Sequence, residues 1–180
     1  MQRVITPQGW REEEFPLPPM FAPSLPYVGR ENVRFAPGWS EPSQENHWTY
    51  AFVWQLEGNP DLSPNSLRTN ISTYFHGLIS KLSAKLETRD SNPISVQTEF
   101  GDVFTIHKNV VVQQMVISMP DFKTGMRPLR LNTLIHFFEK MQETQRLLFS
   151  ISPHHFDHAV WKQFDLIRDG LINDAEVTAP

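Results

Sequence analysis

Three histidines and an aspartate crowd into the stretch SPHHFDHAV near the end of the chain: His154, His155, Asp157 and His158. Imidazole and carboxylate groups are common metal ligands, and two histidines four residues apart on a helix can bind one zinc ion. His154 and His158 have this spacing, in a segment whose apolar residues predict a helix over 153–169. These two histidines are the candidate metal ligands of the sequence.

Two features of the same segment argue against a metal ion. On an ideal helix His154 and His158 lie opposite the apolar stripe, and Lys162 follows one turn later, where it repels a divalent cation. The next carboxylate on that face, Asp165, lies too far along the helix to reach the same ion. We therefore expect exposed polar histidines with no metal and no other cofactor, and metal binding by this pair is the alternative.

The other candidate histidines stand singly in the sequence. His76 lies on a predicted helix, whereas His107 and His136 lie on predicted strands. If His107 and His136 were neighbours, with Glu99 or Glu139 close by, they could carry out acid–base chemistry. The three histidines predict a small-molecule-binding or hydrolytic site in a pocket between sheet and helix. The alternative is that each is a hydrogen-bonded structural residue.

Large aromatic residues indicate a second kind of site. Trp39 lies in the loop sequence APGWSEPS, and exposed tryptophan in loops is common at binding surfaces. Tyr27 and Trp48 lie on either side of it in the chain. The three residues together predict a binding surface, and the alternative is that Trp39 folds back onto the sheet.

Composition limits the classes of protein that fit. The chain has 180 residues, enough for one domain, and its 39% apolar content is typical of globular proteins. A net charge of −4 with scattered Lys and Arg predicts no nucleic-acid partner. No apolar run approaches the roughly 18 residues that would span a membrane. Because the chain has no Cys, disulfides, thiolate zinc sites and cysteine nucleophiles are excluded.

Turn signals and periodicity predict the elements that position these residues. Residues 1–45, here called the front end, are rich in proline and aromatics, which predicts an extended segment packed on the body with one short strand at 31–36. Ser63-Pro64 predicts the start of a helix of about 22 residues, in which Gly77 would allow close approach to a strand. The closing helix would begin after Ser152 and end at Gly170. The body would span 46–172, and 173–180 would form a tail.

Alternation of apolar and polar residues predicts the strands. Residues 48–56 alternate with a heavily aromatic face, and the further candidate strands are 94–99, 103–107, 110–119, 129–138 and 146–151. Several strands in succession predict hairpins and an antiparallel sheet. Residues 1–180 are therefore predicted to form a single α+β domain, a twisted antiparallel β-sheet with two amphipathic helices packed on it.

This order of elements, together with the segment LNTLIHFFEKMQETQRLLFSISPHHFDHAVWKQFDLI, resembles the PsbP-like family. That family includes the Ran-binding nuclear import protein of yeast and the bacterial DcrB lipoproteins. In its members a β-hairpin likewise runs into a closing helix with an aromatic-aliphatic stripe. The resemblance implies a PsbP-like sandwich over the C-terminal part of the chain, and the front end departs from the pattern.

The opening GWREEEFPLPPMFAPSLPY resembles the start of mature exported bacterial proteins of unknown function. The first residues contain no apolar stretch of a signal peptide. A native start at Met1 would predict a cytoplasmic protein, whereas a Met1 added to a mature chain would predict a periplasmic or secreted one.

These observations together predict a non-enzymatic binding or interaction module of an exported bacterial protein. Its partner would be a protein or a small molecule that contacts the front end around Tyr27–Trp39. The competing prediction is the histidine pocket, and the metal site comes last.

Overall fold

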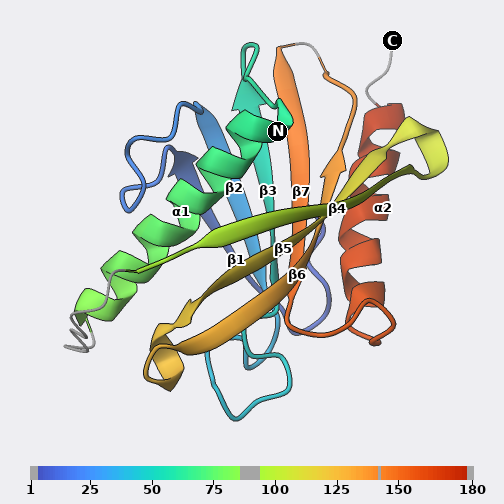
Figure 1. Ribbon diagram of the computed structural model, residues 1–180. Coiled ribbons are helices and arrows are strands. Elements are labelled where there is room, and N and C mark those ends of the chain that lie inside the picture. The colour runs from blue at the N-terminus through green and yellow to red at the C-terminus, as the bar shows by residue number, and fades with distance from the viewer. Residues whose placement is uncertain (1–3, 86–93, 142, 178–180) are drawn as a thin grey trace.

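The computed structural model describes residues 4–85, 94–141 and 143–177. These described residues form seven strands and two α-helices (Figure 1). The strands are β1 (Arg11–Leu17), β2 (Gly29–Phe35), β3 (Tyr50–Glu57), β4 (Gln97–Thr105), β5 (Val111–Asp121), β6 (Arg127–Phe137) and β7 (Thr144–Ser152). The helices are α1 (Pro64–Lys85) and α2 (Trp161–Val177), with short 3-10 turns η1 (His107–Asn109) and η2 (Phe122–Thr124).

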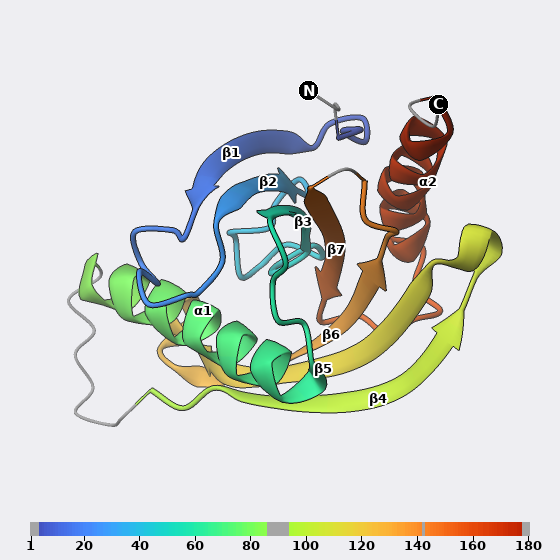
Figure 2. The same cartoon turned by 90° about the horizontal axis from the view of Figure 1, so that it is seen from above.

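All seven strands pair antiparallel in one sheet, in the order β1-β2-β3-β7-β6-β5-β4. The helix α1 connects β3 in the middle of the sheet to β4 at its far edge, and the meander β4 to β7 then returns to pair with β3. Seen from above, the sheet bends around α1, and α2 lies on its other side (Figure 2). The predicted α+β class with an antiparallel sheet and two helices is confirmed, and the PsbP-like label stays a prediction.

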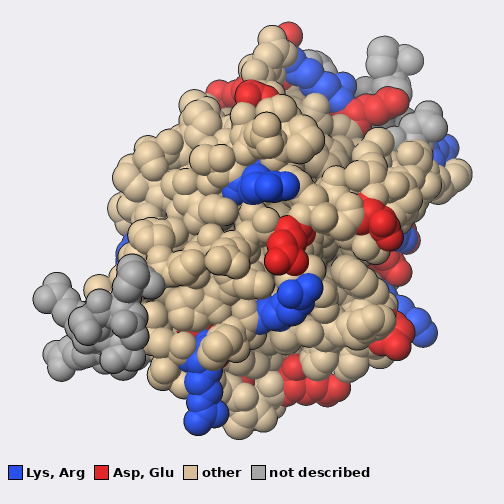
Figure 3. All heavy atoms as spheres, viewed as in Figure 1, with Lys and Arg blue, Asp and Glu red and all other residues tan. Residues whose placement is uncertain are grey.

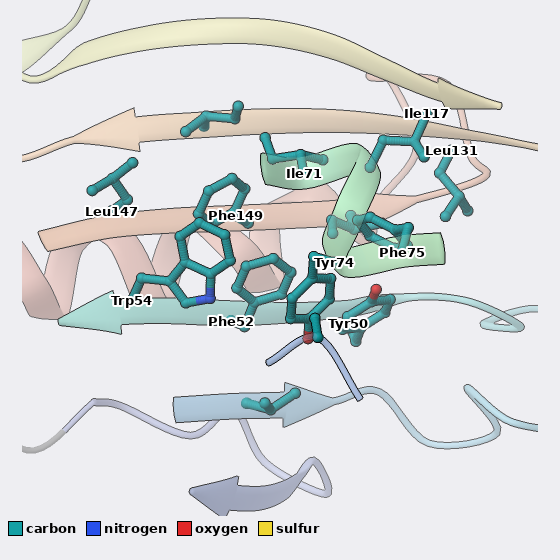
Figure 4. Packing of buried hydrophobic residues seen from close by; sticks show 14 of the residues in the cluster. Tyr50, Phe52, Trp54, Ile71, Tyr74, Phe75, Ile117, Leu131, Leu147 and Phe149 are labelled. Atoms are coloured by element: carbon teal, nitrogen blue, oxygen red, sulfur yellow. The ribbon is translucent and has the colours of Figure 1, made fainter. Parts of the chain in front are cut away.

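The face of the sheet that α1 covers packs aromatic rings together with aliphatic side chains (Figure 4). Side chains alternate between faces along a strand, so Tyr50, Phe52 and Trp54 of β3 all point toward α1. The ring of Phe52 stacks on Phe149 of β7 with centroids 4.5 Å apart, and Tyr74 of α1 packs on the other side at 5.3 Å. Buried rings of this size contribute most of the apolar area of such a core.

The opposite face packs against α2 and is more polar. Its apolar cluster includes Val53 and Leu148 of the sheet with Phe164 and Ile167 of the helix. Two arginines are also buried on this face and donate hydrogen bonds to backbone carbonyls. Arg34 bonds the carbonyl of Val4, and Arg146 bonds that of Leu171 in α2. The two faces are thus closed by different chemistry.

The structure of the front end differs from the prediction. It contains two paired strands, β1 and β2, where we expected one. In β1, alternate residues Glu12 and Glu14 share a face, and each forms an ion pair with an arginine of β2: Arg34 and Arg30. A charged, proline-containing segment can be a strand here because it lies at the edge of the sheet. The two predicted strands 94–99 and 103–107 are one strand, β4, with a register shift between Phe100 and Val103.

The predicted start of the closing helix is wrong. Residues 153–160 form successive turns, in which the N–H of His158 bonds the carbonyl of His155 and the N–H of Trp161 bonds that of His158. The indole of Trp161 also donates to the carbonyl of His155, which fixes this turn ahead of the helix. Gly170 lies inside α2 and does not end it. The predicted tail therefore begins within α2, and residues 178–180 lie outside the described residues.

No helix in the described part of the chain is long and apolar enough to cross a membrane.

Candidate functional site

A pocket of about 490 Å³ forms where the front end meets α1 and the chain that leads into β4. We call it the front-end pocket. Residues 21–24 form one wall, residues 72–77 of α1 form the second, and residues 94–96 form the third. His76, one of the predicted pocket histidines, is exposed on the helix wall. The front end and a candidate histidine therefore line the same pocket.

Gly77 sets the distance between α1 and the front end. A Cβ at this position would lie 2.0 Å from the carbonyl oxygen of Phe21, so only glycine allows the two backbones to approach this closely. The prediction for Gly77 is corrected, because the close neighbour is the front-end backbone and not a strand. Ala22 and Leu25 are buried beside this contact, and the ring of Phe21 packs edge-on against Tyr74 at 5.0 Å.

The polar groups of the front-end pocket are uncharged hydroxyls around one imidazole. The hydroxyls belong to Ser24, Ser72, Thr73 and Ser95. Among the described residues that line it, none is Asp, Glu, Lys or Arg. Figure 3 shows the side of the molecule on which α1 lies, where residues other than Lys, Arg, Asp and Glu cover most of the surface. The pocket can therefore form hydrogen bonds but offers no fixed charge.

A second pocket, of about 560 Å³, lies between the β4–β5 turn and α2. We call it the α2 pocket. It is lined by His107 and Lys108 of η1 and by Arg168 and Asp169 of α2, with apolar and amide groups between them. The Arg168 guanidinium already bonds the carboxylates of Asp165 and Asp169. The charges on the helix side of this pocket are thus paired with one another.

His136 lies on the face of the sheet that α2 covers and is only 3% exposed. Burial, followed by the positive charge of Arg168, lowers the pKa of His136 from 6.5 to about 4. The ring is therefore neutral at neutral pH. His136 is not among the residues that line the α2 pocket, and neither Glu99 nor Glu139 lines it. His107 and His136 lie at the same end of the sheet. His136 is buried outside the α2 pocket that His107 lines, so the two do not form the predicted acid–base site there.

The structure buries two of the three aromatic residues of the predicted binding surface. Tyr27 is 2% exposed and donates its hydroxyl to the carbonyl of Asp61, and Trp48 is 1% exposed. Because both side chains are buried, the prediction that they form part of an exposed binding surface is wrong. Trp39 is half-buried and folds back onto the sheet, stacked on Phe35 with ring centroids 4.3 Å apart.

Asp121 at the end of β5 holds the loop at 37–48, which contains Trp39 and Trp48. Its carboxylate accepts hydrogen bonds from Trp48 Nε1 at 3.0 Å and Thr124 Oγ1 at 3.0 Å and lies 2.9 Å from His47 Nε2. Burial raises the pKa of Asp121, but the hydrogen bonds from His47, Trp48, Lys123 and Thr124 outweigh burial and lower the pKa overall. The polar groups of this cluster bond one another, which indicates a structural role that the sequence did not reveal.

His154 and His158 do meet, although not on a helix. Their rings stack with centroids 3.8 Å apart, His154 Nε2 lies 2.7 Å from the carbonyl oxygen of Glu45, and His158 Nε2 lies 3.0 Å from Glu45 Oε1. Stacked, parallel imidazoles do not aim their lone pairs at one point as a shared metal ion requires. The described residues contain no group of three His, Cys, Asp or Glu side chains that could hold a metal ion. The pair instead ties the loop at 37–48 to the chain before α2.

Glu31 is a buried carboxyl group that sequence reasoning missed. It is 2% exposed on the α1 face, where Trp54 Nε1 and the Tyr74 hydroxyl donate to it at 2.9 and 2.7 Å. Burial raises the pKa of Glu31 from 4.5 to about 7, although both hydrogen bonds lower it. Glu31 alternates with Val33 in β2, so the period of the strand could have placed it in the core.

No protein-family model matches this chain, and no curated protein or solved structure does either.

Proposed function

We propose that this protein is a binding module whose ligand occupies the front-end pocket. The observation that carries the proposal is the meeting of the front end with His76 and Gly77 around one concave site of about 490 Å³. Ligand sites are usually concave, with a few polar groups set among apolar ones. The leading prediction from the sequence used the front end around Tyr27–Trp39. This pocket instead uses residues 21–24 of the same segment, together with His76 of the competing prediction.

A binding role fits the pocket better than catalysis does. Nucleophilic catalysis requires a base within hydrogen-bond reach of the nucleophile and a third group that orients the base. The described lining of the pocket offers His76 as base but no carboxylate to orient it. Ser72 Oγ lies 3.5 Å from Thr98 Oγ1, a distance at the limit of a hydrogen bond, and no described hydrogen bond joins it to His76. We therefore propose a non-enzymatic module, and an exported location remains a prediction.

Screening a library of chemically diverse fragments by ligand-observed NMR tests this function. We expect hits on the wild-type protein that are weakened or lost in His76→Ala. The matched control is His155→Ala, which also removes an exposed imidazole but lies outside the pocket. Hits that survive His76→Ala and disappear in His155→Ala would refute the site, as would a screen with no hits.

A further inference from the structure

The front-end pocket offers no charged partner to a charged ligand among the described residues that line it. A carboxylate or ammonium group that enters it loses part of its hydration, and no described Asp, Glu, Lys or Arg lines the pocket to form an ion pair with it. The α2 pocket, by contrast, is lined by Lys108, Arg168 and Asp169. The front-end pocket therefore suits an uncharged molecule.

The hydroxyl groups define the ligand more closely. Each of Ser24, Thr73 and Ser95 has a hydroxyl that both donates and accepts, and His76 adds its ring nitrogens to the polar groups of the pocket. These groups pair best with ligand groups that can also do both. Hydroxyls have this property, whereas a carboxylate only accepts and an ammonium group only donates.

Apolar side chains line the pocket together with the hydroxyls. Phe21 and Pro23 come from the front end, and Ile94 and Val96 come from the chain leading into β4. Sugar rings have the same mixed character, with C–H groups on their faces and hydroxyls around their edges. On the basis of the proposed function, we infer that the ligand of the front-end pocket is an uncharged polyhydroxylated molecule, a neutral sugar or polyol.

Titration calorimetry with short neutral oligosaccharides tests this inference. The probes are maltopentaose, cellopentaose and penta-N-acetylchitopentaose, and trigalacturonate serves as the anionic comparison. We expect at least one neutral sugar to bind with an affinity that is unchanged between 50 and 500 mM NaCl, because salt screens only charged contacts. Trigalacturonate should not bind.

Two threonines of α1 provide a matched pair of variants. Thr73→Val removes a hydroxyl from the pocket wall at constant shape, and we expect it to weaken neutral-sugar binding about 5- to 10-fold, as the loss of one hydrogen bond predicts. Thr69→Val makes the same change one turn earlier, outside the pocket, and should leave the affinity unchanged.

The outcomes separate this inference from the proposed function. If fragments bind in a His76-dependent manner but no neutral sugar binds, or only trigalacturonate does, the ligand class is overturned and the binding site stands. Equal effects of Thr69→Val and Thr73→Val on sugar binding would also overturn it. If neither fragments nor sugars bind, both proposals fall.

Discussion

The N-terminal segment contacts the helix on each face of the sheet, through its backbone at α1 and through a side chain at α2. On the α1 face the backbone of Phe21 lies against Gly77, and on the α2 face the side chain of Ile5 lies against Gly170. Backbone cannot yield to a new atom, whereas the end of an isoleucine side chain can. The backbone contact therefore fixes the geometry of the front end beside α1, where the pocket lies.

Each face also buries a group that burial keeps uncharged, and the two groups are of opposite kind. The aromatic α1 face holds Glu31, and the α2 face holds His136, and burial favours the neutral form of both. Their effects on stability run in opposite directions with pH. The stability that Glu31 contributes is therefore lost at high pH, and the stability that His136 contributes is lost at low pH. Substituting each residue separates the two effects.

Glu31→Gln should cause one of the two largest changes in the pH dependence of the free energy of unfolding. The pKa of Glu31 is about 7 in the folded protein and 4.5 for an ordinary glutamate, so its stabilising contribution is complete below pH 4.5 and is lost as pH rises through 7. The difference corresponds to about 3 kcal/mol. Urea unfolding at pH 4.5 and pH 8 should show the stability difference moving by this amount in favour of the variant at pH 8. A difference that does not change with pH would contradict the burial of a neutral carboxyl group.

His136→Gln should show an effect of similar size and opposite sign. The pKa of His136 is about 4 in the folded protein and 6.5 for an ordinary histidine, so its contribution is complete above pH 6.5 and is lost as pH falls through 4. Relative to wild type, the variant should gain about 3 kcal/mol between pH 7.5 and pH 4 in the same unfolding experiment. If wild type and variant lose stability in parallel on acidification, His136 is not the group responsible.

A matched pair of glycine substitutions should give a smaller effect. Alanine favours a helix over glycine by about 1 kcal/mol, yet Gly77→Ala should destabilise the protein by about 2 kcal/mol, because its Cβ would lie 2.0 Å from the Phe21 carbonyl oxygen. Gly170→Ala should change stability by less than about 1 kcal/mol, because the atom it meets first is Cδ1 of Ile5. Thermal unfolding of both variants checks this order, and equal melting temperatures would remove the distinction between the two contacts.

Local signals predicted the elements that depend on local structure. Ser63-Pro64 marked the start of α1 correctly, because the carbonyl of Ser63 accepts the first helical bond from Leu67. The aromatic alternation of β3 was also predicted, since one face of that strand is buried over its whole length. These features need no knowledge of distant partners.

The remaining features depend on residues far apart in the chain. Trp48 looked like a surface residue, but its partner Asp121 lies in another strand. Ser152-Pro153 has the residue types of a helix start, yet the contact of Glu45 with His154 and His158 holds the following residues in turns. The front-end pocket was missed as a unit for the same reason, because its three walls come from separate segments.

The location of the binding site can be mapped by following backbone amide shifts by NMR while a bound fragment or neutral sugar is titrated. We expect shift changes that cluster at residues 21–24, 72–77 and 94–96, with no comparable change at Lys108 or Arg168 of the α2 pocket. Changes centred on the α2 pocket, or on the loop at 37–48, would contradict the assignment of the front-end pocket as the binding site.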